Sequence, residues 1–349
     1  MLEIPHVKVT FRIITPTFLA GTDQTKAEMR ATALKGLLRY WYRALDPNHI
    51  INRISSEKRL FGSYDSRVGQ SRVHIMLDNA DPYYLSVSQT PEIEKSPMYQ
   101  PHPRNLDWAY LSPEQSFTAR ILIQPSLKND ELERAWKGVL ASMWLMMQVG
   151  GIGSQSRRGF GTVQIEKWEP VGDIPEKIKK IMIGFAQVAD QSPETYKKQW
   201  EKEWHEIRRW FPVSPVKSNP TYTCISPRFA TYFSKRTYQD PYEAWESAVA
   251  YFRQIKGDGR YAFGLPVKEG NKVVSTFIEK DSHFKKHVAS PIRIRIPRLK
   301  PNQYLLQFSF LSAPYPEAIN KDGRVSLDAQ KHWRELEQIL AENFFKVGD

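Results

Sequence analysis

Residues 7–45 read VKVTFRIITPTFLAGTDQTKAEMRATALKGLLRYWYRAL, and they predict a strand followed by a helix. Residues 7–14 are rich in β-branched side chains and partly alternate apolar with polar types, which is typical of a strand. Residues 31–45 carry apolar side chains at helical spacing, and Thr32 is the expected N-cap of this helix. The predicted apolar face consists of Leu34, Leu37, Leu38, Trp41 and Leu45.

The remainder of the first half extends this pair into a larger unit. Residues 71–77 and 115–125 are expected to be strands. Residues 131–148 predict a strongly apolar helix, and residues 161–168 predict a closing strand. The resulting order of strand, helix, strands, helix and strand is the βαββαβ order of a ferredoxin-like or RRM-like domain.

The second half repeats similar elements. Residues 240–259 predict a helix with a proline near its start and a glycine after its end. Residues 326–345 predict an amphipathic terminal helix, with Ser326 as its expected cap. Strands are expected within residues 221–233, 290–297 and 303–312.

A boundary between two domains is expected after Pro170. The following residues, 175–210, are charged and helical, and residues 211–220 form a proline-containing linker or loop. We therefore predict an α+β fold of two ferredoxin-like domains of βαββαβ type with helical insertions. The N-terminal domain is expected at residues 1–170 and the C-terminal domain at residues 171–349.

The charge of the chain points to a polyanionic partner. The 349 residues carry a formal net charge of +12, from 50 lysines and arginines against 38 aspartates and glutamates. Such a balance favours RNA or DNA, because each neutralised phosphate releases counterions. A basic protein with no nucleic-acid role is the alternative.

Cysteine content and hydropathy indicate the compartment. Cys224 is the only cysteine, which excludes an internal disulfide and a cysteine zinc site and suits a reducing environment. Residues 1–18 lack the basic leader and the apolar core of a signal peptide. The most apolar helix candidate, residues 139–153, is too short to span a bilayer. We expect a cytoplasmic protein without a membrane partner.

The turn into the first helix is one candidate anion site. Free N–H groups and the helix dipole favour negative charge there, where Arg30 precedes the helix and Lys35 lies in its first turn. Lys35, Arg39 and Arg43 are four residues apart, so they share the face opposite the apolar one. Gly36 leaves that surface open to a phosphate. The alternative is a solvated basic face with Gly36 packed against a strand.

The loop GGIGSQSRRGFG, residues 150–161, is a second candidate. Its glycines, Gly153 among them, permit backbone conformations and close contacts that side chains would block. Ser154 offers a hydrogen-bond donor, and Arg157 and Arg158 supply charge. The loop lacks the Lys-Ser/Thr ending of a Walker loop and follows a helix, so nucleotide hydrolysis is disfavoured. A clamp on the RNA backbone is the favoured interpretation, and a flexible linker loop is the alternative.

A third basic region combines residues 256–266 with residues 290–300. It contains Arg260 and Arg293 among several cations. Alternation places Arg293 and Arg295 on one strand face and isoleucines on the other. The alternative, slightly favoured here, is a half-buried edge strand whose charges prevent aggregation.

Catalytic and metal-binding patterns are weak. His283 and His287 are four residues apart but lack the glutamate of a zinc-peptidase motif. Cys224 has no nucleophile signature. Asp23, in the loop after the first strand, is an isolated carboxylate that is best explained as a turn residue. We expect no cofactor and no metal.

Several motifs in this order resemble the RAMP superfamily of CRISPR-associated proteins, and most closely the first-subunit family of the type III-B (Cmr) complex. The motifs are TPTFLAGTDQTKAEMRATALKGLLRYWYRAL (15–45), LFGS (60–63), GGIGSQSRRGFGTV (150–163), FGLP (263–266) and ASPIRIRI (289–296). The long first motif is specific, whereas many RAMP proteins share the glycine-rich loop.

The resemblance implies two ferredoxin-like domains and a role in antiviral defence within a ribonucleoprotein. Its partners would be guide RNA (crRNA), possibly target RNA, and other RAMP subunits of the Cmr complex. The family places the first subunit at the head of the complex, near the guide RNA 3′ end. The RNA contacts implied by the motifs are Arg30, Lys35, Arg39, Arg43, Ser154, Gln155, Arg157 and Arg158.

The resemblance also bears on catalysis. Related backbone RAMP subunits cleave target RNA with an aspartate in the loop that contains Asp23 here. The first-subunit family is not known chiefly as a nuclease, so we expect a non-catalytic RNA-binding subunit in which Asp23 is structural. The alternatives are a RAMP-type endoribonuclease that processes or cleaves RNA, and a scaffold whose basic surface meets acidic proteins.

Overall fold

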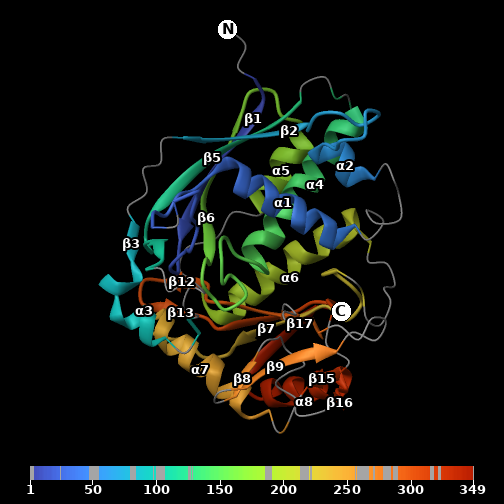
Figure 1. Cartoon of the computed structure of the whole chain (residues 1–349). Coiled ribbons are helices and arrows are strands. Elements are labelled where there is room, and N and C mark those ends of the chain that lie inside the picture. The colour runs from blue at the N-terminus through green and yellow to red at the C-terminus, as the bar shows by residue number, and fades with distance from the viewer. Residues whose placement is uncertain are drawn as a thin grey trace.

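A computed structural model describes most of the chain (Figure 1). The described residues are 4–23, 25–46, 55–78, 84–96, 98–99, 107–124, 127, 129–184, 191–212, 220, 222–255, 257, 267–269, 272–277, 284–285, 290–314, 318–320 and 324–348. Helices and antiparallel strands alternate along them, so the predicted α+β class is confirmed. No helix within these ranges is long and apolar enough to cross a bilayer.

The first half is built on a four-stranded antiparallel sheet with the order β2-β5-β1-β6. Helices α1 and α4 pack against each other on one face of this sheet (Figure 1). The face they cover is apolar because alternate residues of β1 point toward them: Val7, Val9, Phe11 and Ile13 are all buried. The elements are β1 (His6–Ile13), α1 (Ala31–Leu45), β2 (Val73–Asp78), β5 (Ser116–Ile123), α4 (Asn129–Gln148) and β6 (Val163–Val171).

Short elements are inserted into this half, α2 (Ser56–Phe61) between α1 and β2 and the others between the second and third strands, β2 and β5. The others are β3 (Tyr84–Ser86), η2 (Val87–Gln89), α3 (Pro91–Lys95) and β4 (Ala109–Leu111). Strands β3 and β4 pair with each other, so the insertion carries its own small ribbon.

The second half repeats the connection pattern of the first. Its main sheet has the order β11-β14-β7-β17, again antiparallel, with helices α7 and α8 at the corresponding places along the chain. Figure 1 shows this sheet and its helices in the lower part of the molecule. The elements are β7 (Ala230–Ser234), α7 (Pro241–Arg253), β11 (Ile292–Arg295), β14 (Gln307–Phe310), α8 (Ala329–Ala341) and β17 (Phe344–Gly348).

Further strands and helices accompany the second half. A separate sheet and a two-stranded pair are inserted into it, and two helices connect it to the first half. These elements are β8 (Val267–Glu269), β9 (Lys272–Phe277), β10 (Phe284–Lys285), β12 (Arg298–Lys300), β13 (Gln303–Tyr304), β15 (Ala318–Asn320), β16 (Arg324–Ser326), α5 (Glu176–Gly184) and α6 (Pro193–Trp210).

Two predicted helix caps are wrong. The N-cap of helix α1 is Arg30, two residues before the expected Thr32; it makes no side-chain hydrogen bond, and Thr32 lies inside the first turn. Helix α8 is capped by Asp328, whose Oδ1 accepts from the Lys331 N–H at 3.0 Å, rather than by Ser326. A carboxylate at the cap also complements the positive end of the helix dipole, which favours Asp328.

The two halves share their cores. Helix α6 lies between them, with Trp200 5.0 Å from the Trp144 ring of α4 and Trp204 4.8 Å from the Phe229 ring that precedes β7. Buried residues of both halves therefore occur together in each of two hydrophobic clusters. Each half is stabilised by contacts that the other provides, so removing one half would expose a large apolar surface.

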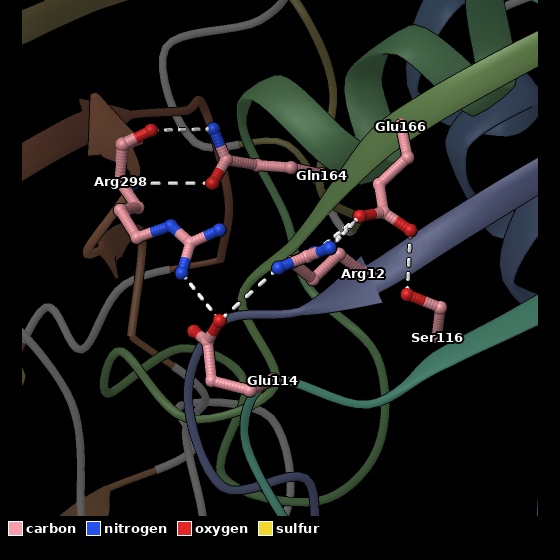
Figure 2. Close-up of polar contacts among 6 residues, drawn as sticks. All are labelled: Arg12, Glu114, Ser116, Gln164, Glu166 and Arg298. Atoms are coloured by element: carbon pink, nitrogen blue, oxygen red, sulfur yellow. Dashed lines mark hydrogen bonds and ion pairs between the residues drawn. The ribbon is translucent and has the colours of Figure 1, made fainter. Parts of the chain in front are cut away.

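A polar clamp also joins the halves (Figure 2). Glu114 accepts from Arg12 of β1 at 3.2 Å and from Arg298 of β12 at 2.5 Å. Arg12 also pairs with Glu166 of β6. The Gln164 side chain bonds both backbone groups of Arg298, through Nε2 to the carbonyl at 2.9 Å and through Oε1 from the N–H at 3.1 Å. We call Arg12 and Arg298, together with the carboxylates of Glu114 and Glu166 that neutralise them, the carboxylate-bridged pair.

Candidate RNA-binding site

The glycine-rich loop, residues 150–161, lies at the junction of the two halves and is bonded to both. The Ser154 N–H donates to the Phe18 carbonyl at 2.7 Å, in the loop after β1. The Ile294 N–H of β11 donates to the Arg157 carbonyl at 3.0 Å, and Trp245 Nε1 of α7 donates to the Arg158 carbonyl at 3.0 Å. The loop is thus fixed in position, unlike the flexible linker that we considered as an alternative.

Two of its glycines are required by geometry. Gly153 has φ of +84°, and a Cβ there would lie 2.3 Å from the Phe18 carbonyl oxygen. Gly159 has φ of +89°, and a Cβ there would lie 2.5 Å from Trp245 Nε1. A left-handed backbone next to such contacts admits only glycine. Gln155 adopts φ of +60° between them, so the SQS turn is tightly bent.

Two arginines from different halves meet beside this loop. Arg157 donates through Nη1 to the Ser290 carbonyl at 2.5 Å, and Arg293 of β11 donates through Nη2 to the Tyr40 hydroxyl at 2.5 Å. The Arg293 guanidinium also lies 4.7 Å from the Trp41 ring centroid. Arg158 completes the group and donates to the Met98 carbonyl at 3.3 Å. We call Arg157, Arg158 and Arg293 the junction arginines.

The junction arginines carry positive charge that no carboxylate of the described residues balances. Within the described ranges, none of the three forms an ion pair with a carboxylate. Burial, followed by the nearby charge of Arg293, lowers the pKa of Arg157 to about 10. Burial also lowers the pKa of Arg158. Burial would raise the pKa of Tyr40, but the charges of Arg293 and Arg157 bring it below its usual value. These shifts describe a site of excess positive potential.

Arg293 lies deeper than the sequence suggested. Its strand β11 is the terminal strand of the second sheet, as the edge-strand alternative required. Its arginines are nevertheless covered, with Arg293 only 5% and Arg295 only 1% exposed. Arg295 bonds the Val163 carbonyl of the first half at 3.1 Å. The arginine face of β11 is therefore buried against the first half, where Arg293 contacts Tyr40.

Two of the predicted cations of α1 are partly neutralised. Arg39 and Arg43 both pair with Oε1 of Glu57, Arg43 through Nη2 at 3.0 Å. Glu57 is 1% exposed, so this carboxylate is held inside by the two arginines. Arg39 also donates to the Gly62 carbonyl at 3.0 Å. Two cations share one acid here, which leaves roughly one positive charge for a ligand.

The two cations at the start of α1, Arg30 and Lys35, are not neutralised by a carboxylate of the described residues. Arg30 is exposed and donates through Nη2 to the Ala20 carbonyl at 3.1 Å. Lys35 is half-buried, and burial followed by the charge of Arg39 lowers its pKa. Neither has a carboxylate partner within the described chain. Gly36 is exposed, with no atom within 4 Å of the position of a Cβ, which overturns the alternative that it packs against a strand.

The remaining predicted residues fall elsewhere. Arg260 lies outside the described residues, as do His283 and His287. Asp23 accepts from the Thr25 N–H at 2.9 Å and from its hydroxyl at 2.6 Å, and these bonds lower the pKa of Asp23. That geometry is an Asx turn, consistent with a structural role.

Tyr40 and Trp41 contact Arg293, and the sequence patterns do not predict these contacts. The helical spacing places Trp41 on the apolar face and indicates no role for Tyr40. One signal was available: Tyr40 lies one turn after Gly36, so an aromatic hydroxyl shares the helix side with the open glycine. Contacts with Arg293 could not be predicted, because they join residues 253 positions apart.

Comparison with known proteins gives one family and one fold. Residues 10–164 match the family model of the RAMP superfamily. The CRISPR system Cmr subunit Cmr1-2 of Pyrococcus furiosus is 24% identical over 180 residues, which are 44% of this chain and 91% of that protein. These matches confirm the resemblance that the sequence motifs indicated.

Solved structures extend the likeness along the chain. The crystal structure of Cmr1 from Pyrococcus furiosus in its apo form matches with a TM-score of 0.60 and 21% identity, over 98% of each chain. A chain in the cryo-EM structure of the type III-B Cmr-beta complex bound to cognate target RNA matches with a TM-score of 0.62 and 12% identity, over 97% of this chain and 99% of that one. The chain thus resembles the RAMP superfamily over residues 10–164 and has the fold of Cmr1 along nearly its whole length.

Proposed function

We propose that the chain is a non-catalytic RNA-binding subunit of a type III-B CRISPR ribonucleoprotein. It would hold the guide RNA on its 3′-end side, the target RNA, or both, at the head of the complex in antiviral defence. Its partners would be the other RAMP subunits of a Cmr complex. The likeness to Cmr1 and to a chain of a target-RNA-bound Cmr complex supports this assignment.

The observation that carries the proposal is that none of the junction arginines pairs with a carboxylate in the part of the chain that the structure describes. Buried or half-buried cations are normally paired, because removing a charge from water is costly. Arg157 and Arg293 instead bond neutral carbonyl and hydroxyl oxygens. A phosphate would supply the missing negative charge and accept from a guanidinium in bidentate geometry. With a pKa of about 10, Arg157 is still charged at neutral pH.

The surface around these arginines suits a sugar–phosphate backbone. Gly36 permits close approach to α1, and Ser154 is exposed at the turn of the glycine-rich loop. Arg30 and Lys35 add charge along the start of the same helix. Contacts of this kind fix the register of an RNA strand, while base pairing with the guide supplies sequence specificity.

We further propose that each half is a ferredoxin-like domain, with the boundary at residue 170. The support is the repeated topology: both halves run strand, helix, strand, strand, helix, strand, and both sheets place the second, third, first and fourth strands in that order. The shared cores explain why the two domains would behave as a single folding unit.

The experiment is an RNA-binding measurement on the full chain with Arg157→Ala combined with Arg158→Ala. Losing two charge-assisted contacts should weaken binding roughly 10- to 100-fold, with little dependence on RNA sequence. Arg67→Ala is the matched control, because Arg67 is exposed and already bonded to Asp65 at 2.7 Å. An affinity equal to that of the control would remove the glycine-rich loop from the RNA site.

A further inference from the structure

A pocket of about 500 Å³ opens on the first half, bounded by α1, α2, α4 and α6. It is separate from the junction arginines. Tyr42 lines the pocket, whereas Tyr40 contacts Arg293. Two residues apart on a helix are about 200° apart around its axis, so the pocket and the junction lie on opposite sides of α1. Pockets of this volume are typical of small-molecule sites.

The floor of the pocket is buried and preformed. Tyr42, Leu60 and Ala135 line it and are all buried. Gly138 of α4 lets the Tyr42 ring approach, because a Cβ there would lie 2.6 Å from that ring. The Phe211 ring stands 5.8 Å from the Tyr42 ring, at nearly a right angle. The floor is thus aromatic and held by packing.

One wall of the pocket is aromatic. Trp210 lines it at the end of α6, with its indole N–H donating to Glu206 at 3.0 Å. The nitrogen is therefore occupied, and the ring is fixed in orientation. Lys137 lies 5.9 Å from the Trp210 ring centroid. A fixed indole next to Phe211 offers a surface on which a planar base can stack.

The rim of the pocket has an excess of positive charge. Its lining includes four cations and two carboxylates, namely Arg59, Arg72, Arg134, Lys137, Asp46 and Glu131. Arg59 and Arg134 are exposed, and the guanidinium of neither bonds any residue of the described chain. Arg72 lies 4.0 Å from Glu131, the limit of an ion pair. Two arginines are thus available to an anion.

We propose that this pocket binds a nucleotide. Its phosphate would lie between Arg59 and Arg134, and its base would stack on Trp210 and Phe211. A phosphomonoester carries between one and two negative charges at neutral pH, which matches the excess of the rim. The nucleotide is either a free nucleoside monophosphate or an unstacked nucleotide of an RNA strand, since both present the same base and phosphate. This site does not depend on the RNA contacts of the junction arginines.

The test is calorimetric titration of the full chain with AMP, with adenosine and inorganic phosphate as partial ligands. AMP should bind saturably and more tightly than either part. Arg59→Ala combined with Arg134→Ala should weaken AMP binding about tenfold or more, and Trp210→Ala should weaken it by a similar factor. The arginine variants are at exposed positions, so they test the site even if Trp210→Ala fails to fold.

A short oligoadenylate distinguishes the two sources. Competition with AMP at equal or higher affinity identifies an RNA nucleotide, and its absence identifies a free nucleotide. Arg157→Ala with Arg158→Ala should leave AMP binding unchanged, so the two sites fail independently. The proposal is overturned if AMP does not bind saturably, if the change of Arg59 and Arg134 has no effect on AMP binding, or if an acidic peptide binds in place of AMP.

Discussion

Two groups of arginines join the halves of this molecule, and they differ in what neutralises them. In the carboxylate-bridged pair, Arg12 and Arg298 meet Glu114 and Glu166, so the charges balance (Figure 2). The junction arginines meet carbonyl oxygens, a tyrosine hydroxyl and a tryptophan ring instead. The first group is neutralised within the fold, whereas no carboxylate among the described residues neutralises the second.

The same difference divides the predicted cations of α1 into two groups. Arg39 and Arg43 belong with the balanced group, because Glu57 holds both. Arg30 and Lys35 belong with the unbalanced group, since neither has a carboxylate partner in the described part of the chain. We therefore expect RNA affinity to depend more on the start of α1 than on its middle.

The largest effect is expected from reversing charge at the junction. Arg157→Glu combined with Arg158→Glu replaces two phosphate-seeking cations with two repelling anions, and RNA binding should fall by more than about 100-fold. Filter binding on the folded variant, with its melting temperature as control, measures this. Wild-type affinity in a folded variant would mean that the unpaired charge has no RNA ligand.

Glu203 is the opposite case, a buried carboxylate that forms no ion pair with a cation in the described ranges. Glu203 of α6 is 5% exposed and is bonded by Trp144 Nε1 at 2.6 Å and by Gln199 at 2.6 Å. Burial raises the pKa of Glu203 to about 7 from an ordinary value of 4.5. The folded state then binds more protons than the unfolded state between these values, so stability falls as pH rises from about 4.5 to 7.

The Glu203→Gln substitution should remove this loss of stability with rising pH. At pH 8 the variant is expected to exceed the wild type in free energy of unfolding by on the order of 2 kcal/mol, and at pH 4 the two should be similar. Urea unfolding across this range measures the difference. Parallel pH profiles of the two proteins would show that Glu203 is not the group that titrates.

A smaller effect is expected at the carboxylate-bridged pair. Glu114→Gln leaves Arg12 and Arg298 without their shared acid, and the free energy of unfolding should fall by about 1 kcal/mol because the pair is partly exposed. RNA affinity should not change. Glu92→Gln is the control, because Glu92 is exposed and forms no ion pair with a described residue. A loss of RNA affinity in Glu114→Gln would erase the distinction between the two groups.

No effect on RNA integrity is expected from the candidate nuclease residues. Asp23 is engaged in a turn with Thr25, and His74 is exposed on β2. RNA incubated with the wild type, Asp23→Ala or His74→Ala, with and without divalent metal, should remain intact. Cleavage by the wild type that either variant abolishes would establish the endoribonuclease alternative.

Much of the fold was predictable from local patterns. The alternation of Val7, Val9 and Phe11 identified the first strand, and the helical spacing around Trp41 identified α1. The caps were less predictable, because Thr32 and Ser326 fit the residue preferences but not the local geometry. Cap choice depends on where the chain turns, and single residue types do not specify it.

The site was predictable in position but not in detail. The glycines and arginines of residues 150–161 indicated the junction loop as a candidate site, because glycines permit close contacts and arginines supply charge. Pairing of Arg39 and Arg43 with Glu57 depends on how α2 packs, and burial of Arg293 depends on a surface from the other half. Both are consequences of tertiary contacts that no local pattern encodes.

The salt dependence of RNA binding tests the central claim most directly. Each cation that neutralises a phosphate contributes about one to the slope of log affinity against log salt concentration. Arg157→Ala combined with Arg158→Ala should therefore flatten the slope by about two, while Arg12→Ala and Arg67→Ala leave it unchanged. A double variant with the wild-type slope would contradict the claim that the junction arginines bind RNA phosphates.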